Sequence, residues 1–225
     1  MWKRFAPALA AGILAGLTAP AVAGEQKLLV QAKVWKRIDV NRKRPTQFKI
    51  AHNRMDVTAD NSVAFLYREL DPVMTSRPKV EWQWRVTKNI PATDQTKARA
   101  DDRPVAVHLW FDDKSGKSLF GSVASLLGRP RVGHLLTYVW GGKREPGTIL
   151  PNPYYPKKGA IIILRNAKTG AAGWRTEKRD IVDDFRRSFG KAPNLATLKY
   201  VSVSGDTDDT RTKSKSQIRA FKITE

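Results

Sequence analysis

The chain has no cysteine and only three histidines among its 225 residues. Without cysteine the fold can contain no disulfide, even in a compartment that would permit one. The histidines lie far apart in the sequence, and none has a metal-binding type of residue close by: they are His52, His108 and His134. The G-x-S-x-G, P-loop, G-x-G-x-x-G and H-E-x-x-H motifs are also missing. These absences argue against several common classes of enzyme.

The first 23 residues have the pattern of a secretory signal peptide. A positive start is followed by an apolar run rich in small residues, and an Ala-Val-Ala cleavage signal ends at Ala23. The apolar run is shorter than the roughly 20 residues that span a bilayer, so a permanent anchor is the weaker interpretation. We therefore expect cleavage after Ala23 and a periplasmic or secreted protein that starts at Gly24. No later apolar stretch is long enough for a transmembrane segment in the mature chain.

The charge is strongly positive, with 41 Lys and Arg against 21 Asp and Glu. Loss of the signal peptide would remove two cations and no acid, so the formal charge falls from +20 to +18. Inside a cell such a charge would suggest nucleic acid. Outside the cytoplasm the available polyanions are envelope glycans, phospholipid headgroups and lipopolysaccharide-type phosphates. We therefore expect no nucleic-acid partner, and the alternative is that the charge mainly maintains solubility.

Alternation of apolar and polar residues dominates the rest of the chain. It is clearest in residues 79–86, where one face carries Val80, Trp82, Trp84 and Val86. The strands expected on this basis cover residues 27–35, 47–53, 62–70, 79–86, 104–111, 134–141, 159–165, 198–205 and 216–223. They predict an all-β fold, a mostly antiparallel β-sandwich or barrel. We expect residues 24–225 to form a single domain.

Two segments have helical spacing instead. Residues 117–128 form the weaker pattern. In residues 179–193, Ile181, Phe185 and Phe189 recur every four residues, which predicts an amphipathic helix whose apolar stripe faces the core. Gly190 and Pro193 provide the stop signal.

Paired carboxylates are the main candidates for chemistry. Asp101-Asp102 precedes one expected strand, and Asp206 and Asp208 follow another. The stretch D-x-D resembles the start of a calcium loop, but Gln217 stands where the EF-hand has its glutamate. Three interpretations remain open: a polar turn, a site for a cation or sugar hydroxyls, and a catalytic pair. Asp206 and Asp208 are thus possible Ca²⁺ ligands.

The tryptophans form a second group of candidates, because indole rings stack on sugars and tolerate half-wet surfaces. Trp82 and Trp84 share the apolar face of their strand, so the core is the better interpretation for at least one of them. Trp110 lies on the opposite face from Leu109, and Trp140 ends a strand before two glycines. We consider Trp110 and Trp140 the better candidates for a ligand surface.

Several segments in order resemble the DUF3047 family of exported bacterial proteins of unknown function. They read PKVEWQWRV, ADDRPVAVHLWF, LLTYVWGG, NPYY, GWRTEKRDIVDDFRRSFGKAP and VSVSGDTDDT. The likeness covers about residues 27–225, and the family's recurring positions carry over as Asp101, Asp102, Trp174, Arg179, Asp180, Asp184, Asp206, Asp208 and Thr210. Asp209 stands where the family usually has asparagine. The resemblance implies an extracytoplasmic β-sandwich similar to carbohydrate-binding jelly rolls, with one or two short helices, and it implies no reaction.

These observations favour a non-catalytic envelope protein that binds a polyhydroxylated or anionic glycan. One alternative is a polysaccharide-acting enzyme that uses two aspartates, of which Asp101 or Asp102 opposite Asp206 or Asp208 is the pairing to test. We expect the basic surroundings to lower carboxylate pKa values, which disfavours a general acid. A second alternative is a partner in envelope protein assembly. If the acidic residues meet, they need a compensating cation, which we expect to be Ca²⁺ or Arg179.

Overall fold

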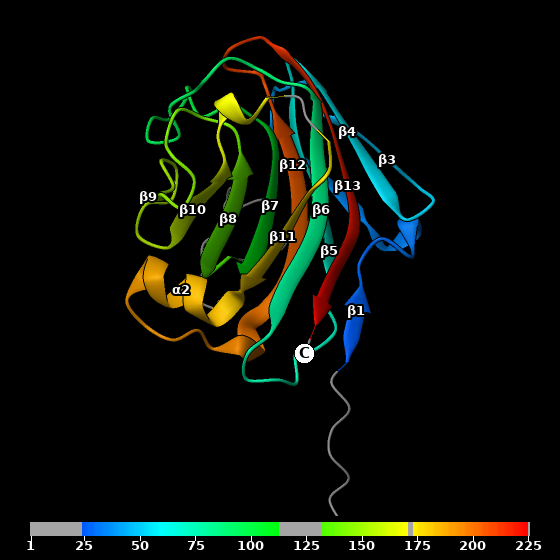
Figure 1. The fold of residues 1–225 in the computed structure, drawn as a ribbon, viewed down its shortest axis with the longest axis vertical. Coiled ribbons are helices and arrows are strands. Elements are labelled where there is room, and N and C mark those ends of the chain that lie inside the picture. The colour runs from blue at the N-terminus through cyan, green and yellow to red at the C-terminus, as the bar shows by residue number, and fades with distance from the viewer. Residues whose placement is uncertain (1–23, 113–131, 171–172, 225) are drawn as a thin grey trace, which may run out of the picture.

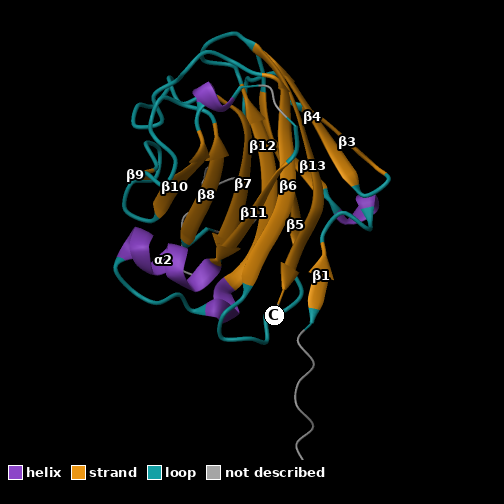
Figure 2. Cartoon of the chain, viewed as in Figure 1, coloured by secondary structure: helices purple, strands orange, loops and turns teal. Residues whose placement is uncertain are grey.

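The computed structural model describes residues 24–112, 132–170 and 173–224, and it shows two β-sheets packed face to face (Figures 1 and 2). The first sheet has six strands in the order β11-β6-β13-β4-β3, with β1 also paired to β13. Its strands are β1 (Glu25–Lys27), β3 (Gln47–Ala51), β4 (Arg54–Asp60), β6 (Lys79–Lys88), β11 (Arg175–Asp180) and β13 (Lys213–Thr224). All of its pairings are antiparallel.

The second sheet has seven strands in the order β2-β5-β12-β7-β8-β10-β9. They are β2 (Lys36–Asp39), β5 (Val63–Glu69), β7 (Arg103–Phe111), β8 (His134–Trp140), β9 (Ile149–Pro151), β10 (Gly159–Arg165) and β12 (Leu198–Asp206). The pair β8 and β10 is parallel, and the other pairings are antiparallel. The predicted all-β fold, a mostly antiparallel, jelly-roll-like sandwich, is therefore confirmed.

The core lies between the sheets and is built by the alternation visible in the sequence. In β6 the side chains of Val80, Trp82, Trp84 and Val86 are all buried. In β7 the residues Val105, Val107, Leu109 and Phe111 face the same core. Because successive side chains of a strand point to opposite faces, the even-numbered residues of β7 lie on the outer face of the seven-stranded sheet.

The predicted late helix is confirmed as α2 (Ile181–Phe189). Asp180 caps its start by accepting a hydrogen bond from the backbone N–H of Asp183, and Gly190 ends it with a φ of 69°. Ile181 and Phe185 are buried, and Phe189 packs partly against the core. The other short helical segments are 3₁₀ turns at Ala32–Val34, Ala167–Thr169 and Leu195–Thr197.

Some sequence-based expectations differ from the structure. Residues 27–35 do not form one strand: β1 ends at Lys27, and a 3₁₀ turn occupies Ala32–Val34. The strand β4 was missed because the hairpin turns at His52 and Asn53, both with positive φ, and not at the usual Asn-Gly pair. The expected helix at 117–128 and the expected signal peptide at 1–23 lie outside the described residues. Within the described ranges, no helix is long and apolar enough to cross a membrane.

Candidate ligand-binding site

The acidic residues of interest meet at one end of the sandwich. At this end Asp206, the last residue of β12, pairs with Arg103, the first residue of β7. At the opposite end of the same two strands Leu198 pairs with Phe111, whose ring lies 4.7 Å from that of Phe185 in α2. Figure 1 shows this separation, with α2 at the lower end and the arrowhead of β12 at the upper end.

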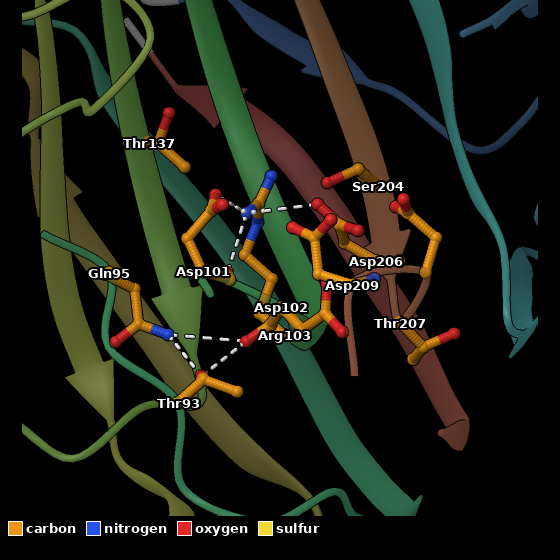
Figure 3. A network of polar contacts seen from close by, with 12 residues as sticks. Thr93, Gln95, Asp101, Asp102, Arg103, Thr137, Ser204, Asp206, Thr207 and Asp209 are labelled. Atoms are coloured by element: carbon orange, nitrogen blue, oxygen red, sulfur yellow. Dashed lines mark hydrogen bonds and ion pairs between the residues drawn. The ribbon is translucent and has the colours of Figure 1, made fainter. Parts of the chain in front are cut away.

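A buried guanidinium organises the cluster (Figure 3). Arg103 Nη1 lies 2.9 Å from Asp101 Oδ2 and 3.3 Å from Asp206 Oδ2, so one cation contacts two carboxylates. The same nitrogen donates to the backbone carbonyl of Asp101 at 3.0 Å. All three side chains are buried. Removal of any one of these three side chains would leave a buried charge without its partner, which is strongly destabilising.

Asp102 has a different role and holds the loop after β12. Its Oδ2 accepts hydrogen bonds from the backbone N–H of Thr210 at 2.7 Å and from the Thr210 hydroxyl. Its Oδ1 accepts a weaker bond from the backbone N–H of Asp209 at 3.3 Å. Because Asp102 is fully buried, these bonds tie the 206–210 loop to the start of β7. Residues about a hundred positions apart are thereby fixed side by side.

Asp208 completes the cluster and contacts Lys43 of the loop between β2 and β3. Oxygens of Asp102, Asp206 and Asp208 lie within 4.8 Å of one another, which is close enough to share a cation. Ca²⁺ takes six to eight oxygens, however. Here Asp102 is occupied by the loop, Asp208 by Lys43, and Asp206 Oδ2 by Arg103. The protein's own cations Arg103 and Lys43 thus already compensate the carboxylates, and the one buried carboxylate oxygen of the cluster without a hydrogen-bond partner among the described residues, Asp206 Oδ1, falls short of the six to eight oxygens of a Ca²⁺ site.

The pKa values in the cluster differ from the expected general lowering. Burial raises the pKa of Asp206 well above that of a free aspartate, against the influence of Arg103, and a hydrogen bond shared with Asp208 raises it further. Burial and the neighbouring Asp208 also raise the pKa of Asp209. The hydrogen bond to Asp208 raises the pKa of Lys43. Overall positive charge therefore does not decide these pKa values; local burial and hydrogen bonding do.

A cavity of about 340 Å³ opens beside the cluster on the outer face of the seven-stranded sheet. Its apolar lining comes from four strands or their adjoining loops and includes an aromatic pair: the residues are Val40, Val63, Phe65, Trp110 and Leu135. The rings of Phe65 and Trp110 lie 6.4 Å apart in an edge-on arrangement. The volume falls in the range of small-molecule sites.

Polar residues lie among the apolar ones in the cavity lining, since Asp206 pairs with Val63 and the ring of His108 lies 5.3 Å from that of Phe65. The polar lining consists of Lys43, Arg99, Asp101, Arg103, His108, Asn152, Tyr154, Asp206, Asp208 and Asp209. Tyr154 is 59% exposed, and its hydroxyl donates to Asp101 Oδ1 at 3.0 Å while accepting from the backbone N–H of Arg99 at 2.9 Å. His108 lies between Thr137 and Ser204 at 3.0 and 2.9 Å. Burial lowers the pKa of His108 well below its usual value, so this side chain is neutral.

The structure separates the remaining sequence candidates. Arg179 is not the compensating cation of the cluster: it pairs with the buried Asp184 of α2 at the opposite end of the sandwich, where Tyr138 donates to the same carboxylate. Trp140 lies in the core, fully buried, with its ring 5.6 Å from that of Trp84. Trp174 lies next to the six-stranded sheet, away from the cavity.

Several site residues were missed from the sequence. Arg103 had a signal, because it directly follows the acidic pair and opens a strand. Tyr154 lies in the NPYY segment quoted above, but that segment did not point to a site. Lys43 and Phe65 had no signal, since the three residues reach the cavity from segments whose spatial order the sequence does not reveal. Only the order of the strands from β2 to β10 in the seven-stranded sheet brings them together.

Fold and site together define a β-sandwich protein with a ligand-sized pocket on the outer face of one sheet. The chain belongs to the DUF3047 family, described as proteins of unknown function, whose sequence profile matches residues 33–222. No curated protein matches the sequence.

Among solved structures, the chain is similar to the family 11 carbohydrate-binding module of a cellulosomal cellulase from Clostridium thermocellum. The identity is 11%, the TM-score is 0.46, and the match covers 90% of this chain and 95% of the module. It is also similar to the xyloglucanase domain of NopAA, a type three effector from Sinorhizobium fredii, solved with cellobiose. There the identity is 10%, the TM-score is 0.45, and the covered shares are 90% and 98%. These similarities concern the arrangement of strands, and they assign no ligand or reaction to this chain.

Proposed function

We propose that this chain is an exported envelope protein that binds a polyhydroxylated ligand, a segment of neutral glycan, in the cavity beside Arg103. The observation that carries the proposal is the composition of the cavity wall. The exposed ring of Tyr154 and the half-buried ring of Phe65 meet a row of carboxylates there, while Trp110 is buried and its ring stacks on that of Tyr67. Rings stack on the apolar faces of sugars, and carboxylates accept hydrogen bonds from hydroxyl groups.

The charge of the cavity supports a neutral ligand over an anionic one. Four aspartates line it: Asp101, Asp206, Asp208 and Asp209. Of the three cations in the lining, Arg103 and Lys43 already contact these aspartates. Little positive charge remains there for an anion, so the cavity itself gives no support to polyanion binding.

The test is a binding measurement with the purified protein against a panel of neutral oligosaccharides. Because Tyr154 is the exposed ring of the cavity, Tyr154→Ala should weaken binding of any glycan found by about tenfold or more, the equivalent of about 1.4 kcal/mol. Tyr154→Phe keeps the ring and should retain most of the affinity. Met74→Ala changes an exposed apolar residue in the loop after β5 and serves as the control. A panel without any binder, or equal losses for Tyr154→Ala and Met74→Ala, would contradict the proposal.

A polysaccharide-acting enzyme is the second candidate, and one observation favours it. The raised pKa of Asp206 suits a general acid, and Asp101 and Asp208 provide carboxylates close to it. Release of reducing ends from a glycan that binds in the cavity, abolished by Asp206→Asn while binding persists, would favour catalysis. Binding without such release would favour the non-catalytic function.

A further inference from the structure

The outer face of the six-stranded sheet carries an excess of positive charge. Its outward positions are known from burial, because Met55, Val57, Trp84 and Ile218 point into the core and their neighbours therefore point out. The acids of this face and its edge already have cationic partners: Asp56 contacts Arg54, Asp60 contacts Lys213, Glu81 contacts Lys178, and Glu25 contacts Lys222. Among the described residues, the outward cations without a carboxylate partner include Lys49, Lys79, Arg85, Lys215 and Arg219.

Two of these cations share one aromatic ring. The guanidinium carbon of Arg219 lies 4.1 Å from the ring centre of Trp174, and that of Arg85 lies 4.8 Å from it. Both distances are within the range of a cation–π contact. Two like charges therefore converge on the same indole, where mutual repulsion favours the arrival of an anion.

Hydrogen bonds fix the orientation of both guanidinium groups. Arg85 Nε donates to Gln217 Oε1 at 2.6 Å, and Arg219 Nε donates to Gln83 Oε1 at 2.7 Å. Gln83 in turn donates to the Thr176 hydroxyl, so the amide is itself held in place. The terminal nitrogens of both arginines make no hydrogen bond to another described residue, and Arg219 is exposed. Each arginine thus presents a pre-oriented fork to solvent.

The register places Lys49 and Lys215 near the two arginines. Reading across the strands, Lys49 pairs with Asp56, Asp56 with Gln217, and Gln217 with Arg85. Arg219 lies on the same strand as Gln217, two residues further on, and Lys215 lies two residues before it. Residues two apart share a face, and neighbouring strands lie about 4.8 Å apart. Lys215 and Arg219 therefore lie in a line along β13, and Lys49 and Arg85 lie at the two ends of a row across the sheet that also contains Asp56 and Gln217.

We propose that the surface formed by Arg85, Arg219 and Trp174 binds a polysaccharide that carries oxyanion groups. Guanidinium forks bind carboxylate, phosphate and sulfate oxygens in pairs. An extended polymer matches the line of cations along β13. A lipid surface matches less well, because the exposed large hydrophobic residues of the described chain, Val30, Met74 and Tyr154, all lie outside the strands of this face.

The experiment measures binding of the purified protein to polygalacturonate and to dextran sulfate, with uncharged dextran for comparison. We expect binding to one or both of the charged polymers and none to dextran. R85Q/R219Q should weaken the binding by about tenfold or more, because it removes two charge-assisted contacts. R85K/R219K keeps the charge but loses the fork and the bond to glutamine, so it should also bind more weakly than the unaltered protein.

The matched control is R186Q/R187Q, which removes the same charge from the exposed side of α2. Its affinity should remain within about twofold of the unaltered protein, since distant surface charges are screened by salt. Tyr154→Ala should leave polymer binding unchanged, which separates this surface from the proposed glycan cavity. Equal losses in both arginine pairs, or no loss in R85Q/R219Q and R85K/R219K with their fold intact, would overturn the proposal. Binding to phosphatidylglycerol vesicles without binding to either polymer would overturn it in favour of a membrane surface.

Discussion

Arg103 shows how one residue can decide the character of a site. Without it, Asp101 and Asp206 would be two buried carboxylates without a cationic partner, and Asp206 would still lie within 4.8 Å of oxygens of Asp102 and Asp208. With it, Asp101 and Asp206 share a positive partner, and all three side chains line the cavity. A buried pair of this kind contributes little net stability relative to apolar residues of the same size, but it fixes one geometry.

The raised pKa of Asp206 predicts how the free energy of unfolding depends on pH. Since the folded protein holds a proton on Asp206 more tightly than the unfolded chain does, the free energy of unfolding should fall as the pH rises through the folded pKa of Asp206. This contribution is fully present below the pKa of Asp206 in the unfolded chain. Asp206→Asn, which cannot ionise, should remove that part of the pH dependence. Urea unfolding at a series of pH values measures it.

The control for this measurement is Asp39→Asn, an exposed position at the end of β2. It should keep the slope of the unaltered protein. His108 acts in the opposite direction, because its lowered pKa removes stability as the pH falls below the usual histidine range. An Asp206→Asn variant with the slope of the unaltered protein at pH values above the usual aspartate range would show that Asp206 ionises normally.

At the scale of the element, α2 closes the end of the sandwich opposite the cavity. Its buried Asp184 accepts from Arg179 Nε at 2.9 Å and from the Tyr138 hydroxyl at 3.0 Å. Phe185 packs between Phe111 and Phe189, with ring centres 4.7 and 4.6 Å away. Asp184 thus ties the helix to β11 of the six-stranded sheet and β8 of the seven-stranded sheet, and Phe185 packs it against β7.

Truncation of this helix anchor should be costly. Phe185→Ala should lower the free energy of unfolding by about 3–5 kcal/mol, the sum of lost burial and the cavity that remains. Thermal or denaturant unfolding of the variant and the parent measures the difference. Arg186→Ala, one residue further and exposed, should change it by less than about 0.5 kcal/mol. A loss of that small size for Phe185→Ala would show that the ring is not part of the core.

The sequence predicts elements well where burial alternates and poorly where it does not. The strand β6 was clear, because its buried residues alternate over its length. The edge strand β11 was missed, because Arg175–Asp180 is almost entirely polar and only its pairing with β6 shows that it is a strand. The site follows the same division. The acidic residues at the start of β7 and the end of β12 could be recognised in the sequence. Which arginine compensates them, Arg103 or Arg179, could not, because that depends on which end of the sandwich each arginine occupies.

At the scale of the whole molecule, the two faces differ in charge. The cavity on the seven-stranded sheet holds more acids than bases, while the six-stranded sheet presents unpaired cations outward. A formal charge of +20 is therefore not spread evenly over the structure. The net charge alone would suggest an anionic ligand for the cavity of the seven-stranded sheet, where acids outnumber bases.

Export is the prediction that belongs to this scale. A chain produced in a bacterial host should be recovered from the periplasm with Gly24 as its first residue, because the Ala-Val-Ala signal precedes it. N-terminal sequencing of the recovered protein is the measurement. Ala23→Leu, which places a large residue at the cleavage position, should slow or block processing. Cytosolic protein that retains Met1 would contradict both the export and the envelope function.

The position of β13 has a consequence for how the chain is made. This strand lies in the middle of its sheet and joins β6 with β11 on one side to β4 with β3 on the other. It is also the strand of that sheet that the ribosome synthesises last. Until residues 213–224 have emerged, the sheet consists of two unconnected halves, and the long-range pairings of β13 with β6, β4 and β1 cannot form. A polypeptide that must thread unfolded through a translocon would be protected by this order from folding prematurely.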